Sequence, residues 1–325
     1  MEGRMLIRLL LMLLPTPLYA GTLLIISSYH PQYLWDISYN QSLQSHLAGH
    51  PDVHYFYLDT KRLPREAFDS RANEALRVYN RLKPDWVLLS DDNAINYLAH
   101  PIADAGTPVV FLGMNENPRY KGLIGHRNVT GVLERPLLKR NIQEMARMMG
   151  GLDRALVLFD SSNVSLAAIE DEFDAQTELR IGRTRVTSEL YEDYSLWQEA
   201  VLKAKQNGYR ALFIGLYHTL KNSAGEHVDE KEVLAWTARN SPVPVFCFWE
   251  FAVGQGQAIG GLVLDGHEQG VRAAELLNAI MAGARPESMA PRAAERGKYS
   301  FSRSELARWH LQPLPQWQEK IEWRP

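Results

Sequence analysis

The sequence repeats one local unit, a short apolar run that ends abruptly in polar or aromatic residues and is followed by a segment with helical periodicity. The first run, residues 22–27, ends in Ser28, Tyr29 and His30. Later runs with the same kind of ending cover residues 86–89, 108–112, 155–159, 211–214 and 243–248. Strands that alternate with helices at this pitch predict βαβ units and parallel sheets. In such sheets ligands are held just beyond the carboxyl ends of the strands.

The pattern occurs twice, once on each side of a less regular passage at residues 119–134. A chain of 325 residues, with 46% hydrophobic and 22% charged residues, is long enough for two cores of ordinary size. We therefore predict an α/β protein with two open parallel-sheet lobes, joined by a hinge and with a ligand cleft between them.

Residues 1–20 have the layout of a secretory signal peptide. Arg4 and Arg8 precede or flank an apolar core at residues 9–14, and Ala20 supplies a small residue at the cleavage point. The core is shorter than the roughly 20 residues that a membrane-spanning helix needs. We expect a mature chain that begins near Gly21, is exported to the periplasm and is not embedded in the membrane. Because no cysteine follows the cleavage point, a lipid anchor is not expected.

Several function classes find no support in the composition and motifs. The net charge of −3 predicts no basic surface for nucleic acid. The single cysteine, Cys247, permits neither an intramolecular disulfide nor a cysteine zinc site. The sequence contains no histidine pair at metal-ligand spacing and no Gly-x-Ser-x-Gly elbow, so we predict no metal, no cofactor and no catalytic residue. A periplasmic hydrolase with paired carboxylates as acid and base is the enzymatic alternative.

Aromatic side chains near the predicted strand ends are candidates for ligand contact. Tyr29 and Trp35 follow the first strand, and Tyr217 and Trp249 follow strands of the second half. Aromatic faces bury much area against flat or apolar ligands. The alternative is that these rings only fill the wall of the cleft. His30, and His218 beside Tyr217, are interpreted as hydrogen-bonding neighbours of the ligand.

Acidic side chains at the same places can hold an ammonium group, because a buried cation needs an opposite charge. The candidates are Asp91, Asp92, Glu116, Glu250 and Asp265. Three of them, Asp91, Asp92 and Asp265, stand just before predicted helices. A carboxylate there can instead cap free backbone N–H groups.

A third set of small polar residues comes before predicted helix starts, where N–H groups and the helix dipole attract anions. It consists of Ser28, Asn115, Ser161 and Ser162. Ser161 and Ser162 could equally be plain helix caps. Aromatic, acidic and anion-attracting positions together favour a zwitterionic ligand, although polar heterocycles remain open.

Several of these motifs also carry a family resemblance. They are Ser28-Tyr29-His30-Pro31, Ser90-Asp91-Asp92-Asn93-Ala94, Gly113-Met114-Asn115-Glu116-Asn117-Pro118, Asn128-Val129-Thr130-Gly131-Val132, Phe248-Trp249-Glu250 and the run at residues 260–266. In their order and spacing the chain resembles the ABC transporter substrate-binding family, which has a type I periplasmic-binding-protein fold. The likeness covers nearly all of the chain after residue 20.

The resemblance implies a monomeric periplasmic protein that closes on an amino-acid-like or aromatic small molecule and delivers it to an ABC permease. The alternative it leaves open is a ligand sensor that docks on a membrane histidine kinase or cyclase. It also implies three crossings between lobes. The expected lobes are therefore residues 21–133 plus 260–284, and residues 134–259 plus about 285–300. Residues 301–325 are expected to form a surface tail.

Overall fold

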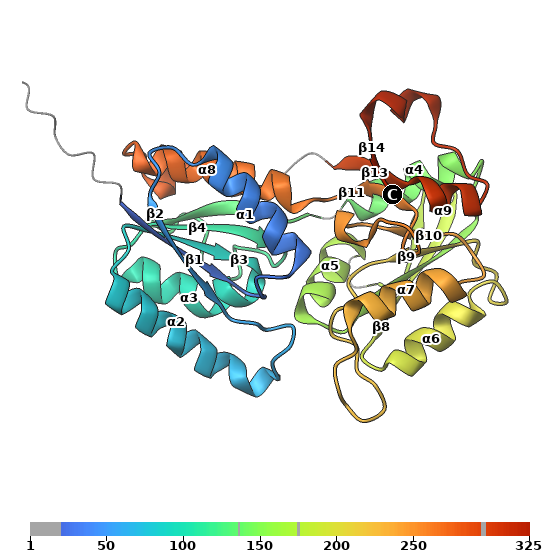
Figure 1. Cartoon of the computed structure of the whole chain (residues 1–325), viewed down its shortest axis with the longest axis horizontal. Coiled ribbons are helices and arrows are strands. Elements are labelled where there is room, and N and C mark those ends of the chain that lie inside the picture. The colour runs from blue at the N-terminus through green and yellow to red at the C-terminus, as the bar shows by residue number, and fades with distance from the viewer. Residues whose placement is uncertain (1–20, 136, 174–175, 294–296) are drawn as a thin grey trace, which may run out of the picture.

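The computed structural model describes residues 21–135, 137–173, 176–293 and 297–325, and it shows two α/β lobes side by side (Figure 1). Each lobe has its own largely parallel sheet, so the predicted two-lobed α/β fold is confirmed. The expected signal peptide, residues 1–20, lies outside the described residues. No helix in the described ranges combines the length and the apolar character needed to cross a bilayer.

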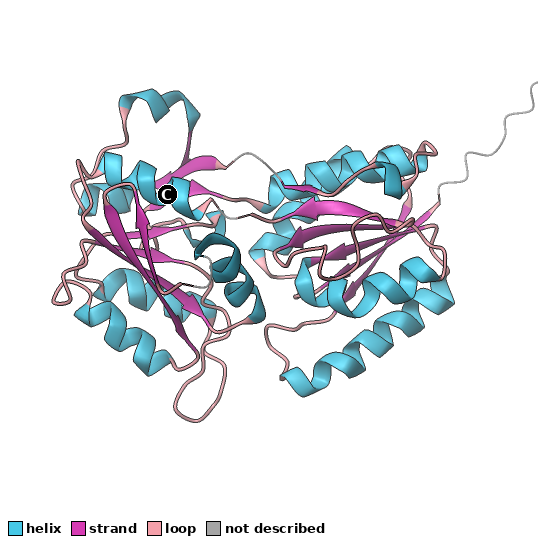
Figure 2. Cartoon of the chain, turned by 180° about the vertical axis from the view of Figure 1, so that it is seen from behind, coloured by secondary structure: helices cyan, strands magenta, loops and turns pink. Residues whose placement is uncertain are grey.

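The sheet of the first lobe is parallel throughout. In spatial order its strands are β12 (Arg292–Ala293), β5 (Val129–Leu133), β4 (Val109–Met114), β3 (Trp86–Ser90), β1 (Thr22–Ser27) and β2 (Asp52–Tyr57). The helices that cover its two faces are α1 (Leu34–His46), α2 (Phe68–Leu82), α3 (Asp91–Asp104) and α8 (Gly266–Met281) (Figure 2). Helices on both faces explain why β1, β3 and β4 are almost wholly apolar and buried.

The sheet of the second lobe has one antiparallel edge. Its strands, in spatial order, are β10 (Val245–Cys247), β9 (Ala211–Ile214), β6 (Arg154–Asp160), β8 (Thr184–Tyr191) and β7 (Glu178–Ile181). Strand β7, which the sequence did not predict, forms a tight hairpin with β8. The surrounding helices are α4 (Leu138–Met148), α5 (Asn163–Phe173), α6 (Tyr194–Lys203) and α7 (Glu230–Asn240).

The C-terminal part of the chain belongs to the second lobe and is not a surface tail. Strands β11 (Gly260–Val263), β13 (Lys298–Ser302) and β14 (Ile321–Arg324) form a small sheet, and α9 (Arg303–Arg308) follows β13. Phe301 is fully buried, and its ring stacks 6.2 Å from that of the buried Trp317. The expectation of a tail fails because strand pairing and aromatic packing bind this segment to the lobe.

Two expected lobe boundaries also differ from the structure. Residues 260–263 pair with β13 in the second lobe, whereas Arg292 and Ala293 pair with Val132 and Leu133 in the first. Helix α8 does pack in the first lobe, against α1. At Gly270 a Cβ atom would lie 2.2 Å from the carbonyl oxygen of Tyr39, so only glycine permits this close approach.

The crossings between the lobes follow strand ends. The chain leaves the first lobe after β5, at Glu134, and returns to it after β11, at Leu264 and Asp265. Because the parallel strands of each lobe end toward the crossings, the polar residues that follow β1, β3, β4, β6, β9 and β10 gather at one junction.

Candidate functional site

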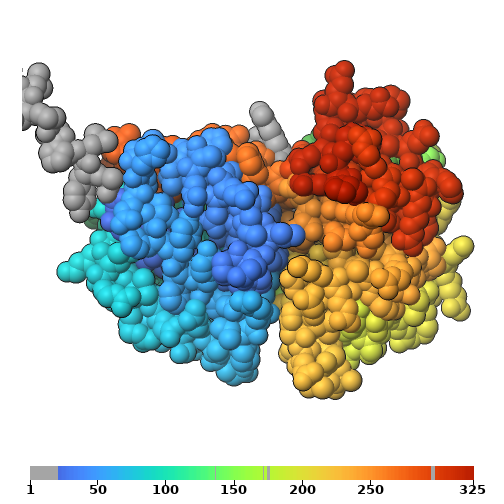
Figure 3. Space-filling model, in the orientation of Figure 1, coloured from blue at the N-terminus to red at the C-terminus, as the bar shows by residue number. Residues whose placement is uncertain are grey.

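The candidate site is the junction where the strand ends of the two lobes meet. In the space-filling view the first lobe, in blue, touches the second, in yellow and orange, along a narrow seam (Figure 3). Side chains at the strand ends are correspondingly buried: Tyr29, His30, Tyr217, His218 and Trp249 are each at most 6% exposed. The lobes are therefore in a closed arrangement.

Aromatic rings from both lobes form the core of this junction. Tyr33, one residue before α1, packs edge-on against Tyr29 at 5.0 Å between ring centroids and against His218 of the second lobe at 5.2 Å. Its ring also lies 5.9 Å from that of Phe251, which stacks on Trp249 at 6.3 Å. Edge-on and offset rings at these distances are favourable contacts, so Tyr33 is a direct apolar link between the lobes.

Beside the rings lies a set of buried carboxyl groups, the acidic cluster, which we define as Asp36, Asp91, Asp92 and Glu134. Each is at most 4% exposed. Burial is the main cause that raises the pKa of Asp91 well above its usual value, and the neighbouring Asp36, Glu134 and Asp92 raise it further. Because charged carboxylates are costly to bury without a partner, the cluster favours either protons or a cation.

Asp36 on α1 is the member with the fewest partners. Among the described residues, neither of its side-chain oxygens has a hydrogen-bond partner. The hydroxyl of Tyr39, one turn further along the helix, is engaged by Ser27 Oγ at 2.5 Å and Ser90 Oγ at 2.8 Å. Burial raises the pKa of Asp36 well above its usual value, and Lys61 and the nearby Tyr39 hydroxyl oppose the rise. A buried carboxyl group with both oxygens unpaired is ready to accept hydrogen bonds from a ligand.

Asp91 is held in an unusual backbone conformation at the first position of α3. Its φ of 64° lies in the left-handed region, and Ser90 Oγ donates a 3.1 Å hydrogen bond to its Oδ2. A Cβ atom on Gly113 would lie 2.8 Å from Asp91 Oδ1, so the glycine leaves room for this carboxyl group. Residues that their surroundings hold in a strained backbone conformation cluster at functional sites.

Glu134 lies at the first crossing and contacts both lobes. The indole Nε1 of Trp249 donates a 2.6 Å hydrogen bond to its Oε1, and Asn115 Nδ2 donates a 3.4 Å bond to its Oε2. Burial outweighs these hydrogen bonds and raises the pKa of Glu134 to about 7. The carboxyl group is therefore poised to change its charge near neutral pH.

Lys61 is the cation that faces the acidic cluster. Its Nζ lies 4.2 Å from the ring centroid of Tyr29 and 4.9 Å from that of Tyr33, within range for cation–π contact. Burial lowers the pKa of Lys61, while carboxylates including Asp160 and Asp91 act in the opposite direction. One ammonium group thus sits among carboxylates that come from both lobes.

Some predicted site residues have their polar atoms engaged in hydrogen bonds within their own lobe. Ser28 Oγ accepts a 2.8 Å hydrogen bond from Ala94 N and donates to Ser90 O at 2.6 Å. Asp92 accepts from the backbone N–H groups of residues 115 and 116, and burial raises its pKa to about 6. Ser162 Oγ donates to Asp160 Oδ1 at 2.6 Å. These hydrogen bonds fix the conformation of the segments that follow the strands.

The side chains of other predicted residues are exposed or form ion pairs outside the aromatic and acidic groups. Glu116 pairs with Lys121 and accepts from Asn96, and Ser161 is exposed. Glu250 and Asp265 each lie 2.8 Å from Nζ of Lys298, and Glu250 also pairs with Arg324. Asp265 in addition caps α8 by accepting from Glu268 N. Glu250 and Asp265 therefore fasten the small C-terminal sheet to the crossing.

The two histidines at the junction are buried and have an unpaired ring nitrogen. Among the described residues, Nδ1 of His30 and Nδ1 of His218 have no hydrogen-bond partner. Burial lowers the pKa of His30, and burial and Lys61 lower that of His218 further. Both rings are consequently neutral near pH 7, and each presents a nitrogen that can still form a hydrogen bond.

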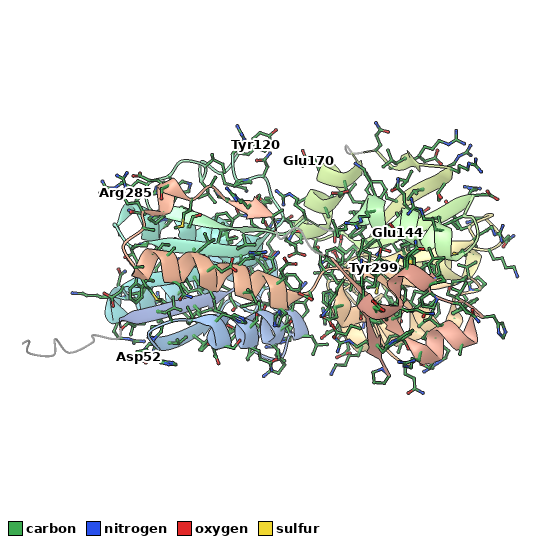
Figure 4. All side chains as sticks on the ribbon, turned by 90° about the horizontal axis from the view of Figure 1, so that it is seen from above. Asp52, Tyr120, Glu144, Glu170, Arg285 and Tyr299 are labelled. Atoms are coloured by element: carbon green, nitrogen blue, oxygen red, sulfur yellow. The ribbon has the colours of Figure 1, made fainter. Side chains whose placement is uncertain are left out.

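Cavities lined from both lobes flank the buried junction. One of about 290 Å³ is lined by Trp35 of α1 and Phe251 of the second lobe, and the buried Nε1 of Trp35 is without a partner among the described residues. Another, of about 490 Å³, lies between Tyr120 and Glu170. Figure 4 labels these two residues, which lie on opposite sides of the seam. The junction is thus hollowed at its margins.

Sequence reasoning missed several residues that the fold brings to the junction, namely Tyr33, Asp36, Lys61 and Glu134. Tyr33 and Asp36 flank the predicted Trp35, so the start of α1 was the available signal. Lys61 follows β2 in the run Asp59-Thr60-Lys61-Arg62, and a lysine after a strand is ordinarily exposed.

Comparison with known proteins identifies the fold but not a family. No family model and no curated protein matches the sequence. Among solved structures, an ABC domain in complex with L-Trp from Streptococcus pneumonia matches with a TM-score of 0.68 at 14% identity, covering 93% of this chain and 100% of that one. A conserved domain protein from Vibrio cholerae matches with a TM-score of 0.67 at 12% identity, covering 94% of this chain and 100% of that one.

An ABC sugar transporter subunit from Rhodobacter sphaeroides matches less closely, with a TM-score of 0.55 at 12% identity over 85% of this chain and 96% of that one. The chain has the type I periplasmic-binding-protein fold.

Proposed function

We propose that the chain is a solute-binding protein that closes on one small zwitterion, an amino-acid-like molecule with an aromatic or apolar side chain, and delivers it to an ABC importer. The observation that carries this proposal is the buried acidic cluster with unpaired oxygens on Asp36. A ligand ammonium group placed there would restore the charge balance that burial disturbs.

The electrostatics of the junction favour an ammonium group over other ligand groups. Burial holds the pKa of Asp36 and Asp91 well above their usual values, so in the ligand-free protein protons compete for these carboxyl groups. A bound ammonium group would replace the protons and form charge-assisted hydrogen bonds, which are roughly twice as strong as neutral ones. The cluster therefore selects a cation that also donates hydrogen bonds.

The other parts of the junction match the rest of such a ligand. Lys61 offers a positive charge to a ligand carboxylate, and Tyr29, Tyr33 and Trp249 offer aromatic faces. L-Trp, the ligand in one of the similar structures, combines these three chemical features. It is accordingly the first compound to test.

Closure of the two lobes on the ligand is the proposed mechanism of binding and recognition. Tyr33 meets His218 and Phe251 across the junction, and Trp249 meets Glu134, so the closed arrangement has contacts of its own. A ligand that touches both lobes shifts the population further toward this arrangement, and a partner can recognise the closed form. We propose an ABC permease as this partner because the structural neighbours include ABC transporter components.

A thermal-shift screen with matched ligands tests the proposed function. L-Trp should stabilise the protein, whereas indole-3-propionate, which lacks the amino group, should not. At a hundred times its Kd a ligand adds about 2.7 kcal/mol of stability. Asp91→Asn keeps a residue that tolerates positive φ and should abolish the shift. Glu199→Gln, a change in an exposed side chain that pairs with Lys203 on α6, should keep it. Equal shifts for the amine and the deaminated compound would refute an ammonium site.

Delivery is tested separately from binding. Proteoliposomes that contain the candidate permease and ATPase should take up labelled ligand only when the binding protein is present. Uptake that is the same without the binding protein would refute the importer role and leave the binding site untouched. Conversion of the ligand during incubation would indicate a hydrolase.

A further inference from the structure

A group of two histidines and one aspartate lies on the first lobe, away from the junction. His100 and Asp104 stand one turn apart on α3, and His126 lies in the segment before β5. One ligand atom from each residue lies within 4.8 Å of the other two. The chain direction of α3 places this group at its C-terminal end, whereas the acidic cluster lies at its N-terminal end.

Hydrogen bonding already orients His100 as a ligand. Its Nε2 lies 2.6 Å from the carbonyl oxygen of Lys121, and a carbonyl can only accept, so Nε2 carries the proton. The lone pair of a neutral His100 is therefore on Nδ1. A histidine whose second nitrogen donates to a backbone carbonyl is the usual arrangement around a bound metal, because that bond fixes the tautomer and the ring orientation.

His126 and Asp104 are already in contact. Nε2 of His126 lies 3.1 Å from Oδ1 of Asp104, and the backbone N–H of Asn128 donates a 3.2 Å bond to Nδ1 of His126. A metal ion between Nε2 and Oδ1 would move the imidazole proton to Nδ1 at the expense of the long Asn128 bond. Nδ1–H and the Asn128 N–H would then both be donors, so the partly exposed His126 ring must turn away from Asn128 when the metal binds.

We propose that His100, Asp104 and His126 bind a Zn²⁺ ion, with water in the remaining position. Two imidazole nitrogens and one carboxylate oxygen suit zinc better than calcium or magnesium, which prefer oxygen ligands. Ligand atoms around tetrahedral zinc are about 3.4 Å apart, close to the 3.1 Å found between His126 and Asp104. The side chains of His100 and Asp104 are exposed, so they can make the small adjustment that remains.

The residues around the proposed zinc site leave space for a water molecule as the fourth ligand. A cavity of about 290 Å³ is lined by Asp104, His126 and neighbouring residues, so water can reach the ion. The ion would fasten the segment that carries His126 to the end of α3. The same segment begins at Asn115 beside the acidic cluster, so zinc would anchor its far end.

Titration of the full-length protein with ZnCl₂ in a calorimeter tests the proposal. The wild type should bind one Zn²⁺. His100→Gln and His126→Gln should each weaken binding by at least about tenfold, the loss that removal of an outer-shell partner already causes. His54→Gln is the matched control, because His54 Nε2 lies 2.9 Å from Asp52 Oδ2 but is not part of a three-ligand group among the described residues. This variant should bind like the wild type.

Co²⁺ supplies a second readout, since a tetrahedral site gives strong visible absorption and an octahedral surface site does not. Melting curves in the presence of EDTA should be alike for all variants, which shows that each is folded. Unchanged zinc affinity in both His100→Gln and His126→Gln, or no stoichiometric binding by the wild type, would overturn the proposal.

Discussion

Trp249 Nε1 donates a 2.6 Å hydrogen bond to Glu134 Oε1, and this bond joins the end of β10 in the second lobe to the first crossing between the lobes. Both partners are almost fully buried. A hydrogen bond to a charged group contributes about 1.5–3 kcal/mol, and a buried carboxylate that loses its donor keeps the full cost of desolvation. The closed arrangement of the lobes therefore depends on this contact.

We predict that Trp249→Phe lowers the free energy of unfolding by about 1–3 kcal/mol and weakens ligand binding. An aromatic ring remains, but it is smaller than indole, so the loss of buried volume must be separated from the loss of the indole N–H by a second Trp→Phe variant. Trp197→Phe is the matched control, because Trp197 Nε1 donates a 2.9 Å bond to Thr237 inside the second lobe. Urea unfolding should show a loss in both variants. Ligand titration should show a loss only in Trp249→Phe, and equal affinities in the two variants would contradict the assignment.

Lys61→Met should change the ligand preference more than the stability of the fold. In the proposed binding mode Lys61 holds the ligand carboxylate, so the variant should lose affinity for L-Trp and lose less for tryptamine, which has no carboxylate. The ratio of the two Kd values should move about tenfold or more, as expected for one charge-assisted hydrogen bond. Calorimetric titration with both compounds measures this ratio.

Arg62→Met is the control for the lysine variant. Arg62 is half exposed and pairs with Asp59 on the surface at 2.7 Å. Exposed ion pairs contribute about 0–1 kcal/mol, so this variant should leave both affinities unchanged. A tenfold change of the ratio in Arg62→Met as well would show that net charge, and not the position of Lys61, controls the preference.

Much of the fold was predictable because the core strands are continuous apolar runs. The predicted bounds of the strands at residues 22–27 and 211–214 agree with β1 and β9. Helix α3 begins at Asp91, which has a positive φ and lies three residues before the first apolar residue of the helical pattern. No periodicity signals such a start.

The parts of the fold and of the candidate site that the sequence did not predict depend on contacts between residues far apart in the chain. Strand β11 pairs with β13 across some 40 residues, and its pattern of glycines carries no information about its partner. The closed lobes bury Asp36 and partly bury Lys61, whereas composition alone predicts exposure for both. The sequence identified the strand ends, whereas the fold decided which of their side chains face one another.

The stability of the ligand-free protein should depend on pH through Glu134. Burial raises its pKa from 4.5 to about 7, so between these values the folded state binds more protons than the unfolded state. The contribution of Glu134 is therefore complete below pH 4.5 and is lost as the pH rises through 7. At one pKa unit per 1.36 kcal/mol, the loss is about 3 kcal/mol at most.

Comparison with Glu134→Gln isolates this contribution, because His30 and His218 titrate in the opposite sense. Burial lowers the pKa of both histidines, so their share of the stability falls as the pH drops through about 6.5. Urea unfolding at pH 5 and pH 8 should show that the wild type loses more stability on going to pH 8 than the variant does. The same difference in both proteins would contradict the raised pKa.

Gly113→Ala should disturb the acidic cluster through Asp91. The glycine has a φ of 69°, and an added Cβ atom would lie 2.8 Å from Asp91 Oδ1, closer than real Cβ contacts permit. Gly106→Ala is the matched control, because Gly106 also has positive φ, of 97°, but has no atom within 4 Å of the added carbon among the described residues. Both variants carry the backbone penalty of about 1 kcal/mol for an alanine in this region.

The difference between the two alanine variants therefore measures the displacement of Asp91. We expect Gly113→Ala to unfold at a lower urea concentration than Gly106→Ala and to lose most of its affinity for the ammonium-bearing ligand. Gly106→Ala should bind the ligand like the wild type. If Gly113→Ala kept full affinity despite its lower stability, Asp91 would not contact the ligand, and the ammonium group would have to be assigned to Asp36 and Glu134.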